Sequence, residues 1–320
     1  MDSLTHALSG VLLGAAFAPS EEQRLPFIVL GAVAGSMPDL DFLCELRGKV
    51  AAWRYHRVLL HGIPMLLPQA LVLYGLSAFT VLAAAPQGLV LSLIVAGLLT
   101  HVFLDSVTSF GTALGFPFSR RRFSTRSHFV VDPLVLMILG AGLYCNMPRA
   151  ALAVGSAYLI SVVVWRQGLL MRARRCARNI GARAERTSVE PGPAAPWRWL
   201  VVTERVDGNY VLAKISWPGC APLCWREVPS RECPESDREQ ATRIPLIAAF
   251  LATADFPRWS RMTDDPRQRD LIVEDVKWWS VLPFRPLAFS IVWQPNQSDP
   301  FAQQQRLSWR ARIAPSNVPT

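Results

Sequence analysis

Long apolar runs alternate with short polar connections in the first half of the chain. Four of these runs, at residues 63–85, 88–104, 130–145 and 150–165, contain almost no charged side chains. An α-helix rises about 1.5 Å per residue, so an apolar run of about 20 residues spans the hydrocarbon core of a bilayer. The pattern therefore predicts four transmembrane helices, in which flanking residues extend the shorter runs.

Two shorter apolar segments precede these runs, at residues 4–18 and 27–37. They predict an N-terminal helical hairpin that is re-entrant or packed within the bundle. Ala16-Phe17-Ala18 resembles a signal-peptide cleavage site, but the preceding segment holds Asp2 and no Lys or Arg. We therefore expect this first segment to be retained as part of the bundle.

The pattern changes abruptly after residue 165. A basic stretch at 166–186 and a proline-rich stretch at 191–196 predict a linker. Beyond it, alternating patterns predict strands at 199–203, 210–217, 271–276 and 287–293 and a helix at 244–253. The predicted fold is mainly α: a polytopic helical bundle at 1–168, a linker at 169–196, and a soluble α+β domain at 197–320 that ends in a loose tail.

The composition supports a membrane protein. Hydrophobic residues make up 51% of the chain and charged residues 18%, whereas soluble domains carry about 25% charged residues. The six cysteines are scattered. Cys220 and Cys224 lack a second close Cys or His pair that would complete a zinc site, so reduced thiols are expected.

The distribution of basic residues gives an orientation. If the apolar segments alternate in direction, one face carries the loops at 38–62 and 106–129 and everything after residue 165, which together hold most of the Arg and Lys residues. The opposite face carries only Arg24 and Arg149. The positive-inside rule therefore places both termini in the cytoplasm, as expected for a multi-pass protein of the bacterial inner membrane.

Histidine and aspartate side chains gather at the ends of the apolar segments. All five histidines lie between residues 6 and 128. With alternating segments, seven polar side chains reach the same cytoplasmic face: His6, Asp39, Asp41, His56, His61, His101 and Asp105. This convergence depends only on the order of the spans.

The residue types in this set suit a metal site. His101 and Asp105 are four residues apart and therefore share one face of a helix. Asp2 and His6 have the same spacing, so Asp2 is a further ligand or orients His6. Imidazole and carboxylate ligands favour Zn²⁺, Mn²⁺ or Fe²⁺ over Ca²⁺. Seven candidate ligands exceed one tetrahedral shell, so the sequence predicts one or two ions.

Each of these residues also has an ordinary structural interpretation. A single interfacial histidine is usually a hydrogen-bonded structural residue, and an isolated Asp-x-Asp is usually a solvated turn or a helix cap. Together they favour a metal, because carboxylates beside apolar spans are costly unless they are paired or coordinated.

Other features are less specific. Three consecutive arginines, Arg120, Arg121 and Arg122, could bind a phosphate group. Alternatively, they are positive charge at the membrane surface that sets the orientation of the helices. Asp132 suits a helix cap or a group that orients a metal ligand, and His128 suits a structural role. The sequence contains no glycine-rich phosphate loop and no recognisable DNA-binding helix, so no direct nucleic-acid binding is expected.

The motifs taken in order resemble a known family. They are Met1-Asp2-Ser3-Leu4-Thr5-His6, Pro38-Asp39-Leu40-Asp41, Tyr55-His56-Arg57 with His61-Gly62, and His101-x-x-Leu104-Asp105-x-x-Thr108-Ser109. This set resembles the YdjM/YbcI family of bacterial inner-membrane proteins, which are described as metal-dependent hydrolases. The resemblance covers roughly residues 1–168.

The resemblance implies a function. The family is distantly similar to zinc-dependent phospholipase C and the P1-type nucleases, which cut phosphate esters. It implies His6, Asp39, His61, His101 and Asp105 as ligands, with Asp41 and His56 as further candidates. This chain has Arg57-Val58-Leu59-Leu60-His61-Gly62 where members usually have Arg-Gly-x-Thr-His-Ser.

The sequence therefore favours a membrane-embedded hydrolase that acts on a phosphate ester or a lipid head group at the cytoplasmic face. Zinc, or alternatively manganese, would activate water, Asp41 or Asp105 would serve as general base, and Arg120 to Arg122 would neutralise the phosphate. The first alternative is a non-enzymatic metal-binding scaffold or regulator whose soluble domain recruits partners. A cation transporter is a further alternative, but it predicts polar residues at mid-span, which 63–85 and 150–165 lack.

Overall fold

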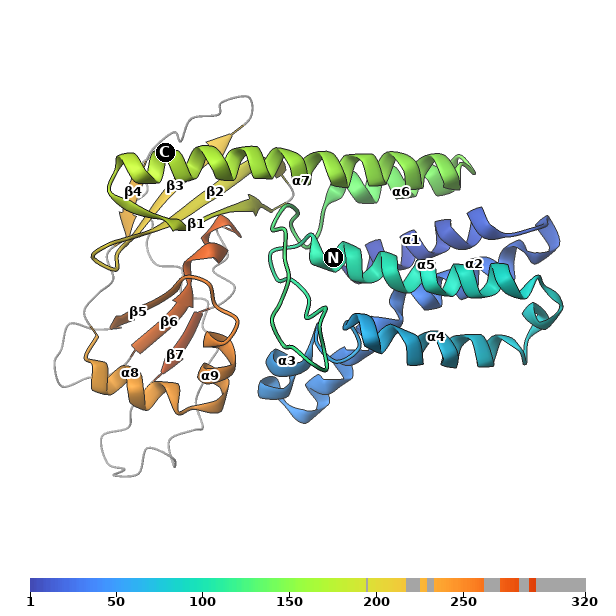
Figure 1. Cartoon of the computed structure of the whole chain (residues 1–320), viewed down its shortest axis with the longest axis horizontal. Helices are drawn as coiled ribbons and strands as arrows, with labels where there is room; N and C mark the ends of the chain where they lie inside the picture. The colour runs from blue at the N-terminus through green and yellow to red at the C-terminus, as the bar shows by residue number, and fades with distance from the viewer. Residues whose placement is uncertain (194, 217–224, 229–232, 262–270, 282–287, 292–320) are drawn as a thin grey trace. The chain divides into compact units, whose positions relative to one another are not determined.

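The structure is a computed structural model that describes residues 1–193, 195–216, 225–228, 233–261, 271–281 and 288–291. Internal contacts divide the chain into two compact units (Figure 1). The helical unit comprises Met1–Gly168 with Pro193–Pro196, and the C-terminal unit comprises Leu169–Gly192 with Trp197–Thr320.

The helical unit is built from apolar helices and short 3₁₀ segments. Their bounds are α1(Ser3–Phe17), α2(Glu21–Ser36), η1(Met37–Arg47), α3(Lys49–Tyr55), α4(Ile63–Ser77), η2(Val81–Ala84), α5(Gln87–Ser106), α6(Pro133–Tyr144) and α7(Pro148–Asn179). Three of the described helices are long and apolar enough to cross a membrane: Glu21–Arg47, Gln87–Ser106 and Pro148–Asn179. The helices α1, α4 and α6 are apolar but shorter.

Two expected segments have different lengths in the structure. The run at 63–85 is not one helix, because α4 ends at Ser77 and extended Thr80 caps the 3₁₀ turn η2 by accepting a hydrogen bond from the Leu82 amide. The segment at 27–37 belongs to a longer helix, because Ser20 caps α2 and the helix begins at Glu21, six residues before the apolar run. Three described helices thus reach the length and hydropathy of a span, and the predicted count of four spans plus a short hairpin stays a prediction.

Glycines bring the backbones of α1 and α2 into contact. A Cβ atom on Gly10 would lie 2.2 Å from the carbonyl oxygen of Gly31, and one on Gly14 would lie 2.2 Å from that of Phe27. Only glycine fits at such distances, which is the packing that Gly-x-x-x-Gly spacing permits between membrane helices. A Cβ on Gly35 would lie 2.8 Å from the carbonyl oxygen of His6. This contact fixes the start of α1 against the end of α2, where the polar residues gather.

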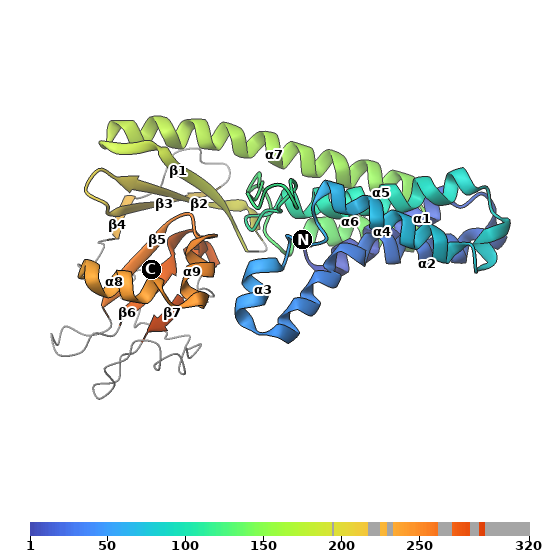
Figure 2. The same ribbon diagram turned by 60° about the horizontal axis from the view of Figure 1, so that its bottom comes forward.

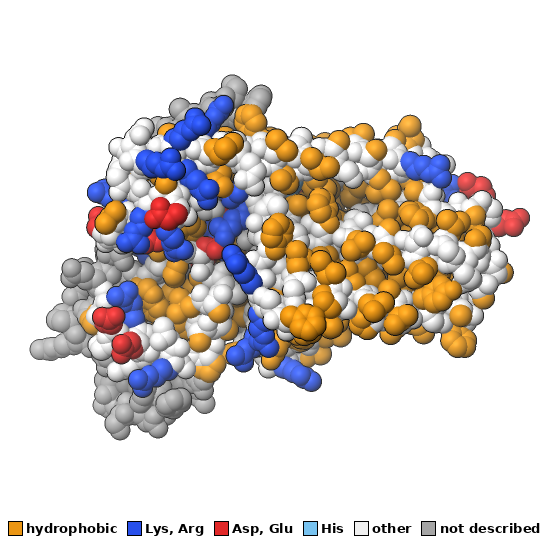
Figure 3. Space-filling view, in the orientation of Figure 1, with side chains coloured by type: hydrophobic (Ala, Val, Ile, Leu, Met, Phe, Trp, Pro, Cys, Tyr) orange, Lys and Arg blue, Asp and Glu red, His pale blue; other side chains and the backbone are white. Residues whose placement is uncertain are grey.

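The outer surface of the helical unit is apolar. Hydrophobic side chains cover the face of these helices in the space-filling view (Figure 3). Leu25, Leu67 and Val164 are among the large hydrophobic residues that are well exposed, at 69%, 65% and 65%. Exposed apolar area of this extent is typical of a surface that faces lipid.

The C-terminal unit contains two antiparallel sheets. The first has the order β1-β2-β3-β4, and its strands are β1(Ala182–Gly192), β2(Ala195–Arg205), β3(Tyr210–Ser216) and β4(Trp225–Val228). Val201 pairs with Ala213, and Gly208 at φ 81° makes the turn between β2 and β3. The second sheet has the order β5(Pro257–Arg261), β6(Leu271–Asp275) and β7(Ala288–Ile291).

Helical segments complete this unit. They are α8(Glu235–Thr242), α9(Pro245–Leu251) and η3(Val276–Val281). Helices α8 and α9 lie beside the second sheet in both views (Figures 1 and 2). The predicted strand at 199–203 lies within β2, and the predicted segments at 210–217, 271–276, 287–293 and 244–253 contain β3, β6, β7 and α9. The sequence did not predict β1, β4, β5 or α8. Residues 217, 287 and 292–293, the cysteine pair at 220 and 224, and the expected tail lie outside the described residues.

The predicted linker is regular structure instead. Helix α7 continues to Asn179, and β1 follows at 182–192. Leu169, Ala173 and Ala177 are buried at intervals of four residues and therefore lie on one face of the helix. This part of the basic stretch is thus an amphipathic helix. Arg172, Arg174, Arg175 and Arg178 are good helix formers that face outward, whereas Arg166 is buried. The outward arginines are why charge alone suggested a linker.

Candidate metal centre

Four side chains from three segments converge in the helical unit. Asp39 lies in η1 just after α2, His61 precedes α4, and His101 and Asp105 lie one turn apart near the end of α5. Each offers one ligand atom, and the four atoms all lie within 4.8 Å of one another. Three of the four residues are buried, and the side chain of Asp39 is 18% exposed.

The distances between these atoms suit a tetrahedral metal site. The Nε2 atom of His61 lies 3.1 Å from Oδ2 of Asp105 and 3.7 Å from Oδ1 of Asp39. The Nε2 atom of His101 lies 3.8 Å from Oδ2 of Asp105, 3.5 Å from Oδ1 of Asp39 and 3.1 Å from Nε2 of His61. Zinc with bonds of 2.0–2.1 Å places its tetrahedral ligands about 3.3 Å apart. The four donors therefore already have nearly the spacing that such an ion requires.

The hydrogen bonds of the two imidazoles turn their free nitrogens toward this point. Nδ1 of His101 donates to the carbonyl oxygen of Gly35 at 2.6 Å, and Nδ1 of His61 donates to Oδ2 of Asp41 at 2.9 Å. In the neutral rings the Nε2 atoms then carry lone pairs. Oδ2 of Asp105 is buried and has no hydrogen-bond partner. Two lone pairs and two carboxylates that face one another are stable only around a cation.

The electrostatics of His61 reflect the same surplus of negative charge. Burial by itself would lower the pKa of His61, but the carboxylates of Asp105, Asp39 and Asp41 outweigh burial and raise this pKa to about 10. Protonation of His61 would balance part of this negative charge. A divalent cation in the cluster would compete with that proton.

A second group of donors shares Asp105. Its Oδ1 atom lies 3.2 Å from Nε2 of His6 and pairs with the α-amino group of Met1, which lies 3.0 Å from the same His6 nitrogen. The rings of His6 and His101 stack at 3.8 Å between centroids. Burial lowers the pKa of the Met1 amino group to about 6. One carboxylate therefore faces two adjacent donor groups, which is the arrangement of a bridging ligand.

Arg57 balances this concentration of carboxylates. Its Nη2 lies 3.1 Å from Oδ1 of Asp105 and donates to the carbonyl oxygen of Met1, while Nη1 donates to Oγ1 of Thr108 at 2.9 Å. Its backbone is left-handed at φ 59°, a conformation that few non-glycine residues adopt. Sequence reasoning missed both Met1 and Arg57, although Arg57 directly follows His56.

Asp41 and His56 lie beside the four-donor cluster and are not part of it. The oxygens of Asp41 accept from Nδ1 of His56 and Nδ1 of His61, both at 2.9 Å. Asp41 therefore orients His61, as carboxylates that hold metal-binding histidines do. His56 is 39% exposed at its side chain, and its contact with Asp41 places it at the edge of the centre.

Two predicted supporting residues are helix caps. Asp2 accepts from the amide and the hydroxyl of Thr5 and so caps α1, instead of orienting the ring of His6. Asp132 caps α6 and accepts from the Tyr158 hydroxyl at 3.0 Å. His128 is buried against Ser127 and Tyr158.

The three consecutive arginines occupy different environments. Arg122 donates to the carbonyl oxygens of His56 and Trp53, and burial lowers its pKa to about 10. Arg120 lies over the Tyr55 ring, and Arg121 is exposed. Arg120 and Arg122 thus brace the loop that carries His56, whereas Arg57 contacts Asp105 of the cluster.

The part of the chain that builds this centre is also the part that other proteins share. The model of the YdjM inner membrane protein family matches residues 1–174. This chain belongs to the YdjM family. The matched residues include every donor of the cluster, and an inner-membrane family agrees with the apolar helices that hold them.

A relative extends the similarity beyond the segment that the family model matches. The chain is 25% identical over 270 residues to a protein of Bacillus subtilis (strain 168) named uncharacterized protein YfhP, and the match covers 81% of each chain. The similarity to YfhP therefore extends beyond the YdjM segment into the C-terminal unit. No solved structure matches the chain.

Proposed function

We propose that this YdjM-family protein is a metal-dependent hydrolase of the inner membrane that cuts a phosphate ester, with a lipid head group as the natural substrate class. The observation that carries this proposal is the four-donor cluster of Asp39, His61, His101 and Asp105, whose spacing suits a tetrahedral ion. The position of the cluster at helix ends, and the exposed edge of Asp39, favour a substrate that arrives at the membrane surface.

The donor set suits zinc or manganese, at one or two positions. A first ion would be held by the four-donor cluster, and a second by His6, the Met1 amino group and the shared Asp105. When bound, such ions lower the pKa of a coordinated water toward about 7 and polarise the bond under attack.

The remaining residues have roles that follow from their contacts. Because both oxygens of Asp41 are bonded to histidines, Asp41 orients His61. Asp105 faces both donor groups, so neither aspartate is well placed as a free general base. We assign proton transfer instead to His56, which is held by Asp41 and is partly exposed. Arg57, with Arg120 and Arg121 at the rim, would neutralise a phosphate.

We also propose a multi-pass topology with the centre and both termini on the cytoplasmic side. Arg47 lies between Asp39 and His61 in the chain, Arg57 contacts Asp105, and Arg120 to Arg122 follow α5. Arg24 and Arg149 lie near the other ends of the helices. This asymmetry supports the orientation by the positive-inside rule. Flanking residues would let α4 and α6 cross with α5 and α7, which gives the four spans, and α1 and α2 form the hairpin.

Elemental analysis of the detergent-purified protein tests the proposal. We expect one to two equivalents of zinc or manganese in the parent chain and near-complete loss in the His101→Ala/Asp105→Ala variant. The matched control is His128→Ala, which removes a buried histidine outside the cluster. A well-folded parent chain that holds no metal, even after incubation with Zn²⁺ or Mn²⁺, would exclude the hydrolase mechanism. If the parent chain does bind the metal, the metal-loaded protein is assayed for hydrolysis of phosphate monoesters and phospholipids.

The alternative is a metal-binding scaffold or regulator whose C-terminal unit recruits partners. The observation that favours it is the separate compactness of that unit, which has sheets of its own. Removal of the metal ligands distinguishes the two functions. A hydrolase would lose its activity, whereas a scaffold would still recruit its partners.

A further inference from the structure

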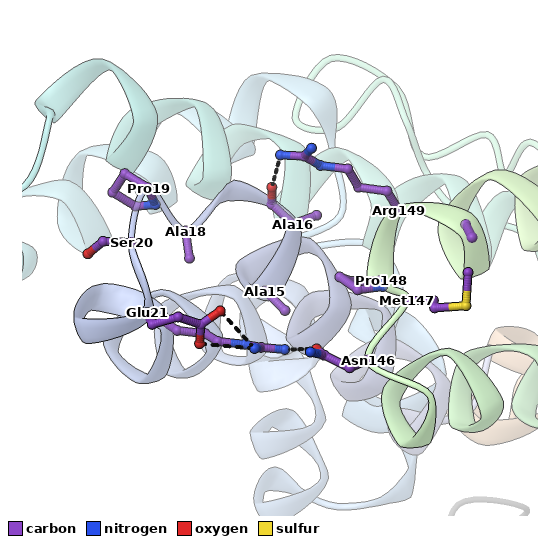
Figure 4. Close-up of a pocket in the computed structure, with 12 residues that line it drawn as sticks. Ala15, Ala16, Ala18, Pro19, Ser20, Glu21, Asn146, Met147, Pro148 and Arg149 are labelled. Carbon is purple, nitrogen blue, oxygen red and sulfur yellow. Dashed lines mark hydrogen bonds and ion pairs between the residues drawn. The ribbon is translucent and has the colours of Figure 1, made fainter.

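A cavity of about 650 Å³ lies at the ends of the helices remote from the metal centre. It is bounded by the end of α1, the beginning of α2 and the turn from α6 to α7 (Figure 4). His6 lies near the first turn of α1, whereas Ala16, which lines the cavity, lies in the last. Ten residues of helix separate them by about 15 Å. The cavity is therefore distinct from the metal centre.

Two guanidinium groups lie at this cavity. Arg149, at the start of α7, donates from Nη2 to the carbonyl oxygen of Ala16 at 3.1 Å. Arg24, in α2, donates to both carboxylate oxygens of Glu21 at 3.1 Å and 3.2 Å, and to Oδ1 of Asn146. A guanidinium carries five N–H donors, and the Ala16 carbonyl engages only one nitrogen of Arg149. With two arginines and one glutamate, the lining has a net positive charge.

Apart from Ser20 and Asn146, the rest of the lining is apolar, and it leads to exposed apolar helix surface. Val154 of α7 is 55% exposed and lies one turn beyond Ala150, which lines the cavity. Leu25 of α2 is 69% exposed and lies one turn beyond Glu21. Residues four apart share a helix face, so each apolar stripe begins at the cavity. A positively charged cavity that opens onto apolar stripes suits a ligand with an anionic head and hydrocarbon chains.

We infer that this cavity binds the phosphate group of an anionic phospholipid, whose acyl chains lie along the exposed apolar side chains of α2 and α7. The two arginines supply charge-assisted hydrogen bonds to the phosphate oxygens. A volume of about 650 Å³ is within the range of small-ligand sites. A lipid suits the surroundings better than free phosphate, because only a lipid uses the adjoining apolar stripes.

Native mass spectrometry of the full chain, released from micelles with equal phosphatidylglycerol and phosphatidylcholine, tests this inference. We expect the parent chain to retain phosphatidylglycerol about tenfold more than phosphatidylcholine. Arg149→Gln should abolish most of this preference, because it removes the charge but keeps an N–H donor for the Ala16 carbonyl. Arg149→Lys should restore part of it.

The matched control is Arg172→Gln, which removes an exposed arginine of the same helix outside the cavity and should leave the preference unchanged. If Arg149→Gln is poorly folded, Arg24→Gln provides a second test of the same charge. Displacement of phosphatidylglycerol by millimolar inorganic phosphate would identify free phosphate as the ligand instead of the lipid. Equal retention of both lipids by the folded parent chain, or a preference that Arg149→Gln and Arg24→Gln both leave unchanged, would overturn the inference.

Discussion

The two ends of the helical unit handle charge in opposite ways. At the metal centre, Asp105 is fully buried and lies among Arg57, His6, His61 and the Met1 amino group. At the other end, Arg24 pairs with Glu21, whose side chain is 85% exposed. Buried charges must be matched by partners or by an ion, whereas exposed pairs are solvated and worth little. Of these two ends, the metal centre is therefore the one that must neutralise a buried charge, the carboxylate of Asp105.

The largest effect is expected at the shared carboxylate. Asp105→Asn keeps the side-chain shape but removes the charge that faces both donor groups and Arg57. We expect loss of bound metal and a destabilisation of about 3–5 kcal/mol, because the Arg57 guanidinium stays buried without its carboxylate. Metal analysis and thermal unfolding in detergent measure the two effects. Asp207→Asn, at an exposed turn, is the control. Metal retention by the folded Asp105→Asn protein would contradict the bridging role.

The second effect concerns the helix contact that supports the centre. Gly10→Ala places a Cβ atom 2.2 Å from the Gly31 carbonyl oxygen, so α1 and α2 must separate. We expect a destabilisation of about 1–3 kcal/mol and weaker metal binding. The comparison is Gly140→Ala in α6, because a Cβ atom at Gly140 meets nothing within 4 Å. This substitution should leave the stability of the protein unchanged or raise it. Similar melting temperatures for the two variants would show that the close contact is not required.

Asp41→Asn separates orientation from coordination. The amide can still meet His56 and His61, but it no longer holds both rings as a charged acceptor. We expect the metal affinity to fall 10–100-fold with little change in fold, which is typical of residues that hold metal-binding histidines. Competition with a metal chelator measures the affinity. His56→Gln is the comparison, and it should keep the affinity because His56 lies outside the four-donor cluster. An equal loss in both variants would make His56 a ligand.

The smallest effect is expected at the remote end. Glu21→Gln breaks an exposed ion pair, so the free energy of unfolding should change by less than about 0.5 kcal/mol. The same change makes the cavity more positive and should increase retention of phosphatidylglycerol. Thermal unfolding and native mass spectrometry measure the two quantities on one sample. A large loss of stability would mean that Arg24 and Glu21 are structural and would remove the contrast between the two ends.

Much of the candidate site follows from the sequence, because segment ends are visible as borders between apolar and polar residues. His61, His101, Asp39 and Asp105 were placed together by span order alone, and the structure brings them within 4.8 Å. Span order could not separate the inner donors from Asp41 and His56, since that choice depends on how the loop from residue 55 to 62 folds.

The missed residues have physical reasons. The Met1 amino group leaves no pattern in a sequence, and the inward turn of Arg57 depends on a left-handed backbone at φ 59°. In the fold, the strand patterns were informative, but the break at Thr80 and the continuation of α7 to Asn179 were not foreseen. In the apolar run at 63–85, α4 ends at Ser77 and the Thr80 side chain caps the next turn. In the basic stretch, the buried Ala173 and Ala177 continue the apolar face of α7.

The glycine contact between α1 and α2 also bears on motion. Where backbones touch, no side chains lie between the helices to change rotamer, so sliding or hinging there would break the contact at once. We therefore expect α1 and α2, with His6 and the adjoining Asp39, to move together. Any opening that admits an ion would then have to leave the contact between α1 and α2 intact.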